Sequence, residues 1–170
     1  MRNLAKFGEP VSSSVWAPDG ETFVTGCLDK ERNLCQWSIN GDLIYDWGQT
    51  HRIQDLAVSP NGHRLVAMDN ACHIHVYNFV TRDLEYEMDF KVQLSSVSIS
   101  HDSRSLLVLT NEGDARLIDL DTRETVRIYR SGDKKSENVI KAAFGGANES
   151  FIITGSESKF KMSSISCVYL

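Results

Sequence analysis

A four-residue turn recurs four times along the 170-residue chain at a nearly constant interval. Self-similarity of about 41 to 45 residues per repeat means that one small structural unit is copied along the chain. Because such a unit cannot bury both of its faces by itself, each copy must pack against its neighbours. The four turns are Ala17-Pro18-Asp19-Gly20, Ser59-Pro60-Asn61-Gly62, Ser100-His101-Asp102-Ser103 and Gly145-Gly146-Ala147-Asn148.

Each turn is flanked by two short segments with the patterns of β-strands. Polar and apolar residues alternate before each turn, which is typical of a strand with one buried face. The segment after each turn is almost continuously apolar, which predicts a strand covered on both faces. Two such strands joined by a tight turn form a β-hairpin. The preceding segments are 11–16, 53–58, 94–99 and 139–144, and the following ones are 23–26, 65–68, 106–109 and 151–154.

Two further strands follow each of the first three hairpins. A third strand ends on a large apolar residue, so that Trp37, Tyr77 and Ile118 occupy one register. A fourth strand is more polar, which suits the outer edge of a sheet. The third strands are 34–37, 74–77 and 115–118, and the fourth strands are 43–47, 84–88 and 125–129.

Four short antiparallel strands in about 40 residues are typical of a blade of a WD-repeat β-propeller. The sequence therefore predicts an all-β fold with about three complete four-stranded blades and a partial fourth. This is about half of a seven-bladed ring, so we expect the ring to be incomplete. The repeat region is 1–157, with blades at 11–47, 53–89, 94–129 and 139–157, a possible outer strand of a preceding blade at 4–7, and a non-matching tail at 158–170.

The composition argues against several classes of partner. The formal net charge is −5 and neither sign forms a block, which disfavours nucleic acid. No apolar run is long enough to span a membrane. Cys27, Cys35, Cys72 and Cys167 form no CxxC pair, which favours a reducing compartment, the cytoplasm, the nucleus or both. We expect Cys27 and Cys35 to be small core residues rather than a disulfide.

Several segments carry a more specific signal than the repeat period. The runs VWAPDG (15–20), TGCLDK (25–30), Asp46-Trp47 and RIQDLAVSPNG (52–62) resemble the middle blades of the WD repeat-containing protein 26 family. The runs IHVYNF (74–79) and AFGGANESFIITGSE (143–157) are similar to later blades of the same family. The second of these is the most specific, because FGGANESF replaces the usual hairpin turn. The resemblance covers residues 11–157.

This resemblance implies a non-catalytic subunit of a GID/CTLH-type E3 ubiquitin ligase that assembles the complex or presents substrates for proteasomal degradation. It implies other proteins as partners, either ligase subunits or substrates. The family also carries LisH and CTLH helical segments ahead of the propeller, and these 170 residues contain neither. One alternative is a generic WD-repeat adaptor of another complex. A propeller hydrolase, the other alternative, would need convergent acids and a metal or nucleophile, which the repeats do not offer.

Two groups of residues are candidates for a structural or binding role. Asp29, Trp37, Asp69 and Tyr77 stand where WD blades tie a turn to a neighbouring strand, so we expect them to be structural. Propeller partners dock on the loops before the first strand and between the second and third strands. Several loop residues are basic, which we expect to be ordinary solvated charge, with the binding of an acidic or degron-bearing peptide as the alternative. These residues are Lys30, Glu31, His51, Arg52, Lys91, Gln93, Lys134 and Lys135.

Neither metal binding nor catalysis is predicted from the sequence. Cys72, His73 and His75 form a short cluster with both histidines on one face of a strand, but a fourth ligand is lacking. We therefore expect a polar turn running into a strand rather than a zinc site. No serine lies in a Gly-x-Ser-x-Gly elbow and no glycine-rich loop opens a helix, so no catalytic residue, cofactor or small-molecule substrate is assigned.

Overall fold

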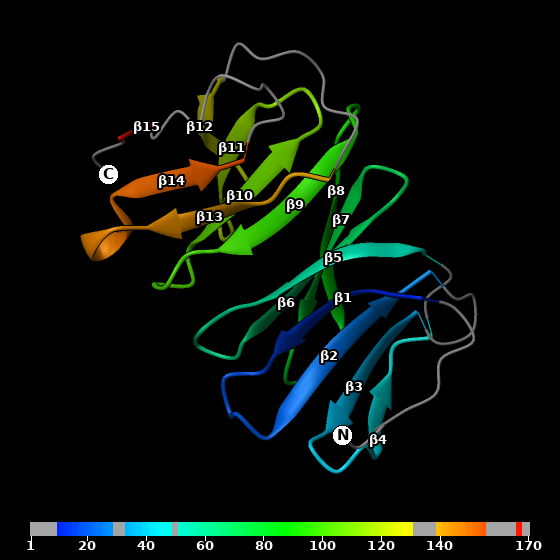
Figure 1. The fold of residues 1–170 in the computed structure, drawn as a ribbon. Coiled ribbons are helices and arrows are strands. Elements are labelled where there is room, and N and C mark those ends of the chain that lie inside the picture. The colour runs from blue at the N-terminus through cyan, green and yellow to red at the C-terminus, as the bar shows by residue number, and fades with distance from the viewer. Residues whose placement is uncertain (1–9, 29–32, 49–50, 131–138, 156–165, 168–170) are drawn as a thin grey trace. The chain divides into compact units, whose positions relative to one another are not determined.

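The computed structural model describes residues 10–28, 33–48, 51–130, 139–155 and 166–167 and arranges them in four antiparallel β-sheets (Figure 1). The chain divides into two compact units, Met1–Asp89 and Phe90–Leu170, and each unit holds two sheets. Within every sheet the strands follow one another in sequence order, as strands joined by hairpins do. In the described ranges, no helix is long and apolar enough to cross a membrane.

The first unit contains two four-stranded sheets that match the first two predicted repeats. Its first sheet consists of β1 (Val11–Trp16), β2 (Thr22–Cys27), β3 (Leu34–Ser38) and β4 (Leu43–Asp46). Its second sheet consists of β5 (Ile53–Val58), β6 (Arg64–Asp69), β7 (His73–Asn78) and β8 (Leu84–Asp89).

The second unit contains one four-stranded and one three-stranded sheet. The four-stranded sheet consists of β9 (Leu94–Ile99), β10 (Ser105–Thr110), β11 (Ala115–Asp119) and β12 (Thr125–Tyr129). The three-stranded sheet consists of β13 (Ala142–Gly145), β14 (Phe151–Thr154) and β15 (Ser166–Cys167), with the short 3-10 turn η1 (Ala147–Glu149) between its first two strands.

The three-stranded sheet departs from the predicted boundaries at both ends. The sequence predicts a first strand at 139–144, but β13 begins at Ala142. Ile140 lies outside the strand because its N–H and its carbonyl oxygen both bond the hydroxyl of Ser95, at 2.8 and 2.6 Å. At the other end, Ser166 and Cys167 pair with β14, although they belong to the segment that does not match the repeat.

The burial of the strands confirms the predicted order within each sheet. In β6 and β10, which lie inside their sheets, every residue after the first is buried, as the continuous apolar runs predict. The outer strands β4, β8 and β12 are mostly exposed. The predicted register of the third strands is also confirmed, since Trp37, Tyr77 and Ile118 pair with Phe23, Leu65 and Leu106.

A β-bulge that the sequence pattern does not reveal lies near the start of the first strands. The pairing of β1 with β2 skips Ser12, and the pairing of β9 with β10 skips Ser95. A bulge re-aims the side chain of the extra residue. Ser12 Oγ lies 2.5 Å from the carbonyl oxygen of Ile53, and Ser95 Oγ lies 2.6 Å from that of Ile140. Each unit therefore joins its two sheets by the same kind of hydrogen bond.

Consecutive sheets within a unit also bury apolar surface against each other. In the first unit, a Cβ atom at Gly26 would lie 2.5 Å from Ile53 Cγ2 and 3.2 Å from Leu56 Cδ1, so β5 approaches β2 where β2 has no side chain. The cluster in the second unit contains Leu107, Leu109, Ala115, Ala142 and Ile152. The cluster in the first unit contains Ala17, Val24, Leu34, Trp47, Ile53, Leu56, Leu65, Ala67, Tyr77 and Phe79.

We predict that Gly26→Ala lowers the free energy of unfolding by about 1 to 3 kcal/mol, because the added methyl group must displace Ile53 in a packed interface. Urea denaturation measures this change. Ile53→Ala removes the obstructing atoms, so Gly26→Ala should cost less in that background than in the wild type. Equal costs in both backgrounds would mean that contact with Ile53 does not limit packing at this position.

Candidate interaction site

The loops predicted to face partners are held together at one edge of their sheets. In the first unit, the N–H of Asn70, in the turn between β6 and β7, donates to the carbonyl oxygen of Arg52, before β5, at 3.0 Å. In the second unit, the N–H of Asn111 donates in the same way to the carbonyl oxygen of Gln93 at 2.9 Å. In each of these two sheets, the loop before the first strand and the loop between the second and third strands therefore meet at one end of the sheet, which we call a composite loop edge.

The structure describes only some of the predicted loop residues. Arg52, Lys91 and Gln93 are exposed. The side chain of Gln93 accepts a hydrogen bond from that of Asn111 at 3.2 Å. Arg52 belongs to the first unit, whereas Lys91 and Gln93 belong to the second. Asp29, Lys30, Glu31, Lys134 and Lys135 lie outside the described residues, so their roles stay predictions.

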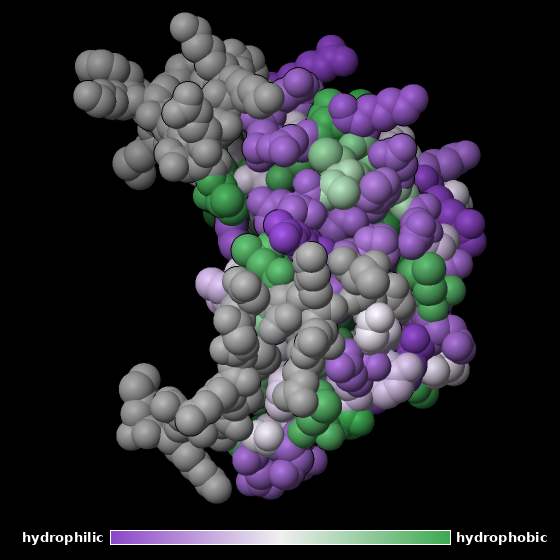
Figure 2. Space-filling view, turned by 90° about the vertical axis from the view of Figure 1, so that its right-hand side faces the viewer, coloured by the Kyte–Doolittle hydropathy of each residue, from purple (hydrophilic) through white to green (hydrophobic). Residues whose placement is uncertain are grey.

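Exposed apolar side chains do not form one continuous patch on the face of the molecule shown in Figure 2. Polar residues cover most of the coloured surface there, and apolar residues form small separate groups.

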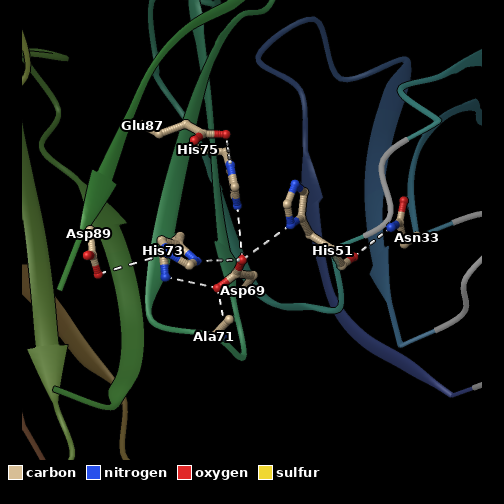
Figure 3. A network of polar contacts seen from close by, with 8 residues as sticks. All are labelled: Asn33, His51, Asp69, Ala71, His73, His75, Glu87 and Asp89. Atoms are coloured by element: carbon tan, nitrogen blue, oxygen red, sulfur yellow. Dashed lines mark hydrogen bonds and ion pairs between the residues drawn. The ribbon is translucent and has the colours of Figure 1, made fainter. Parts of the chain in front are cut away.

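His51, the remaining predicted loop residue, is half-buried and belongs to a cluster of polar side chains (Figure 3). Its Nδ1 atom lies 3.6 Å from Asp69 Oδ2, and its ring centroid lies 4.3 Å from that of His75. Its carbonyl oxygen accepts a hydrogen bond from Asn33 Nδ2 at 2.6 Å. His51 thus connects the turn before β3 to the second sheet rather than projecting freely into solvent.

Asp69, the last residue of β6, lies at the centre of this cluster. Its Oδ1 atom accepts hydrogen bonds from the N–H groups of Ala71 and His73 at 2.8 and 2.9 Å, which fixes the turn into β7. Its Oδ2 atom faces three imidazole nitrogens, His75 Nε2 at 3.1 Å, His73 Nδ1 at 3.3 Å and His51 Nδ1 at 3.6 Å. One buried carboxylate oxygen therefore stands within reach of three histidines.

His75 extends the cluster across the sheet to β8. Its side chain is only 2% exposed, and its Nδ1 atom lies 2.9 Å from Glu87 Oε1. Both nitrogens of this buried ring therefore face carboxylate oxygens. The opposite end of the cluster is more open, because His51 is 36% exposed.

The pKa values of Asp69 and of the neighbouring Tyr77 are shifted in opposite directions. Burial alone would raise the pKa of Asp69, but hydrogen bonds from the N–H of His73, from His75 and from the N–H of Ala71 hold it below its ordinary value. Burial raises the pKa of Tyr77, and the charges of Glu87 and Asp69 raise it further. These donors therefore favour the ionised form of Asp69.

Trp37 and Tyr77, predicted to be structural, are both buried. Trp37 Nε1 donates to Thr25 Oγ1 at 2.9 Å, a hydrogen bond between the third and second strands of the first sheet. The ring of Tyr77 lies 6.4 Å from that of His75 and 6.1 Å from that of Trp47. Neither side chain is accessible to a partner, so their positions agree with a structural role.

Sequence reasoning missed a cation–π contact between the two sheets of the first unit. The guanidinium of Arg82, in the turn between β7 and β8, lies 5.1 Å from the Tyr45 ring, 5.4 Å from the Trp47 ring and 5.3 Å from the Phe79 ring. It also donates to the side-chain oxygen of Gln36. The repeat pattern does not predict this contact, because Arg82 lies in a turn of one repeat and two of the rings that it contacts belong to the preceding repeat.

The unusual FGGANESF run has a physical explanation in the second unit. Gly146 has a φ of 81°, and a Cβ atom there would lie 2.2 Å from the Phe151 ring. Asn148 and Glu149 also have positive φ, at 55° and 54°. The Glu149 carboxylate accepts a hydrogen bond from the N–H of His101 at 2.7 Å, which ties this turn to the turn between β9 and β10.

Sequence comparison identifies relatives over most of the chain. It is 32% identical over 159 residues to GID complex subunit 7 of Schizosaccharomyces pombe and 30% identical over 152 residues to a WD repeat-containing protein 26 homolog of Arabidopsis thaliana, covering 89% and 87% of this chain. The chain belongs to the WD repeat-containing protein 26 family. It spans 31% and 25% of the lengths of these two relatives. No protein-family model matches it.

Comparison with solved structures shows the same fold. The WD40 repeats of RRP9 give a TM-score of 0.70 at 13% identity, over 91% of this chain and 50% of that chain. The structure of U3-55K gives a TM-score of 0.69 at 14% identity, over 91% of this chain and 51% of that chain. The predicted fold class, a WD-repeat β-propeller fragment, is therefore confirmed.

We predict that Gly146→Ala destabilises the second unit by about 1 to 3 kcal/mol, because alanine resists this positive φ and its methyl group collides with Phe151. The matched control is Gly145→Ala, whose Cβ would meet Cδ1 of Ile153 at 3.3 Å and Cγ1 of the same side chain at 3.8 Å. Denaturation curves of the two variants provide the comparison. Equal losses from the two substitutions would contradict a special requirement for glycine at 146.

Proposed function

We propose that this chain is a WD-repeat component of a GID-type E3 ubiquitin ligase complex, in which it binds other proteins without catalysing a reaction. It would act as a scaffold or present substrates for proteasome-dependent degradation. The observation that carries this proposal is the 32% identity over 159 residues to GID complex subunit 7 of Schizosaccharomyces pombe. Likeness to solved WD40 structures adds support for the fold alone, because their identity is 13% and 14%.

The composite loop edges supply the proposed binding surface. Arg52 at one edge and Lys91 at another are exposed cations in a chain of net charge −5. Exposed cations of this kind complement an acidic segment of a partner and raise its association rate. Four cysteines without a CxxC pair suit a reducing compartment, so the location proposed for the complex is the cytoplasm, the nucleus or both.

A segment exchange tests membership of the complex. We expect Schizosaccharomyces pombe GID complex subunit 7 to keep its association with the complex when its 159 matching residues are replaced by this chain. Family-specific surface residues, rather than the blade fold alone, should preserve the contacts. The measurement is co-purification of the chimera with the other subunits.

The control chimera carries the corresponding blades of RRP9, which share the fold at 13% identity. Loss of association in this control, together with its retention in the first chimera, is the expected pair of results. If both chimeras co-purify equally, any WD blades suffice and the chain is better described as a generic adaptor. If this chain alone fails to restore association, the proposed membership is wrong.

Charge reversal tests the loop edges themselves. We predict that Arg52→Glu and Lys91→Glu each weaken capture of partner proteins in the chimera while shifting the free energy of unfolding by less than about 0.5 kcal/mol, because both side chains are exposed. Arg123→Glu is the matched control with the same change of charge, since Arg123 is exposed at the opposite edge of its sheet, between β11 and β12. Equal weakening by all three substitutions would assign the effect to net charge rather than to the loop edge.

A further inference from the structure

Three donor atoms converge beside β6. His51 Nδ1, Asp69 Oδ2 and one ring nitrogen of His75 all lie within 4.8 Å of one another. Asp69 Oδ2 lies 3.1 Å from His75 Nε2 and 3.6 Å from His51 Nδ1. In a tetrahedral zinc site with bonds near 2.0–2.1 Å, neighbouring ligand atoms lie about 3.3 Å apart, which is between these two distances. The group therefore needs only a small adjustment to coordinate one ion.

The hydrogen bond between His75 and Glu87 prepares His75 to bind a cation. When neutral His75 donates its Nδ1–H to Glu87, its Nε2 atom carries a lone pair and faces Asp69 Oδ2 at 3.1 Å. Two lone pairs at this distance repel each other, so a positive species between them stabilises the arrangement. A proton could bridge only His75 Nε2 and Asp69 Oδ2. His51 brings a third ligand atom to the same place, and three ligand atoms suit a metal ion better than a proton.

Metal-bound histidines commonly have such a carboxylate behind them. A ligating imidazole usually donates its other N–H to a carboxylate or carbonyl group, which fixes its tautomer and orientation. Glu87 occupies this position at 2.9 Å from Nδ1 of His75. The N–H groups of Ala71 and His73 restrain Asp69 through Oδ1 and leave Oδ2 to face the histidines.

The first sheet carries different residues at the two described positions that pair in the same way as Asp69 and His75. The pairing of β1 with β2 and of β5 with β6 places Cys27 where the second sheet has Asp69. In the same way, Cys35 pairs with Thr25 where His75 pairs with Ala67. Cys27 and Cys35 are fully buried, so the aspartate and the histidine of the second sheet are not repeated at these two positions.

We propose that His51, Asp69 and His75 form a binding site for a divalent transition-metal ion, with zinc the best fit. Two imidazoles and one carboxylate suit borderline cations of this class better than calcium or magnesium, which prefer oxygen ligands. The 36% exposed His51 provides the side from which the ion enters, while Asp69 and His75 are buried. His73 contacts the same Asp69 oxygen but is not one of the three converging ligands.

Titration of the full chain with Zn²⁺ alone, in competition with a chromophoric chelator, tests the site. We expect one equivalent of Zn²⁺ to bind, and His51→Gln to weaken its affinity by at least about 100-fold, because a ligand is lost. Glu87→Gln should weaken it by about 10-fold to 100-fold, because only the orienting partner changes. Both replaced side chains are partly exposed, so these variants test binding without removing a buried residue.

Matched controls separate this site from other histidines and thiols. His63 is exposed and lies outside the cluster in the same unit, so His63→Gln should leave Zn²⁺ affinity unchanged. Cys72→Ser should also leave it unchanged, since Cys72 is not among the converging ligands. Zn²⁺ should raise the melting temperature of the wild type and not that of His51→Gln. Absence of binding at 1:1 stoichiometry, or binding that survives His51→Gln, would overturn the proposal.

Discussion

Each four-stranded sheet has two faces that must be covered. In the first unit, β5 of the second sheet packs against β2 of the first sheet at Gly26. Sheets lie this close only where one partner lacks a side chain, because packed interiors leave no room for an additional methyl group. The Ser12 bulge sits beside this contact and bonds the carbonyl oxygen of Ile53, the residue that fills the space over Gly26. Steric fit and a directional hydrogen bond therefore act at the same point of contact between the two sheets.

The repeats keep their apolar packing positions and change their polar ones. Trp37 and Tyr77 occupy equivalent places in the two sheets of the first unit, but only Trp37 has a hydroxyl partner, Thr25, because Ala67 replaces that threonine. The second sheet instead places its polar contacts at Asp69 and His75. A polar group buried without a partner is costly, so such changes have to occur as sets of compatible residues.

Much of the fold could be predicted from the sequence, because strand period, apolar burial and turn chemistry all repeat. The bulges could not, since Ser12 and Ser95 fit the alternating pattern as well as paired residues would. The start of β13 was predicted too early because the backbone bonds of Ile140 go to Ser95 instead of the ladder. Only part of the candidate site could be recognised in the sequence. Cys72, His73 and His75 lie together in the sequence, whereas His51 comes from another loop and reaches Asp69 only in the folded chain.

The polar cluster and the loop edge of the second sheet share their backbone. Asp69 fixes the turn that contains Ala71, and the N–H of Asn70 in that turn donates to the carbonyl oxygen of Arg52. His51, which contacts Asp69, directly precedes Arg52 and is held to the first sheet by Asn33. Anything that restrains His51 against Asp69 therefore restrains the backbone that carries the exposed Arg52. Ordering a loop before binding reduces the conformational entropy lost when a partner docks, so under the proposed function the buried cluster would favour binding at this edge without touching the partner.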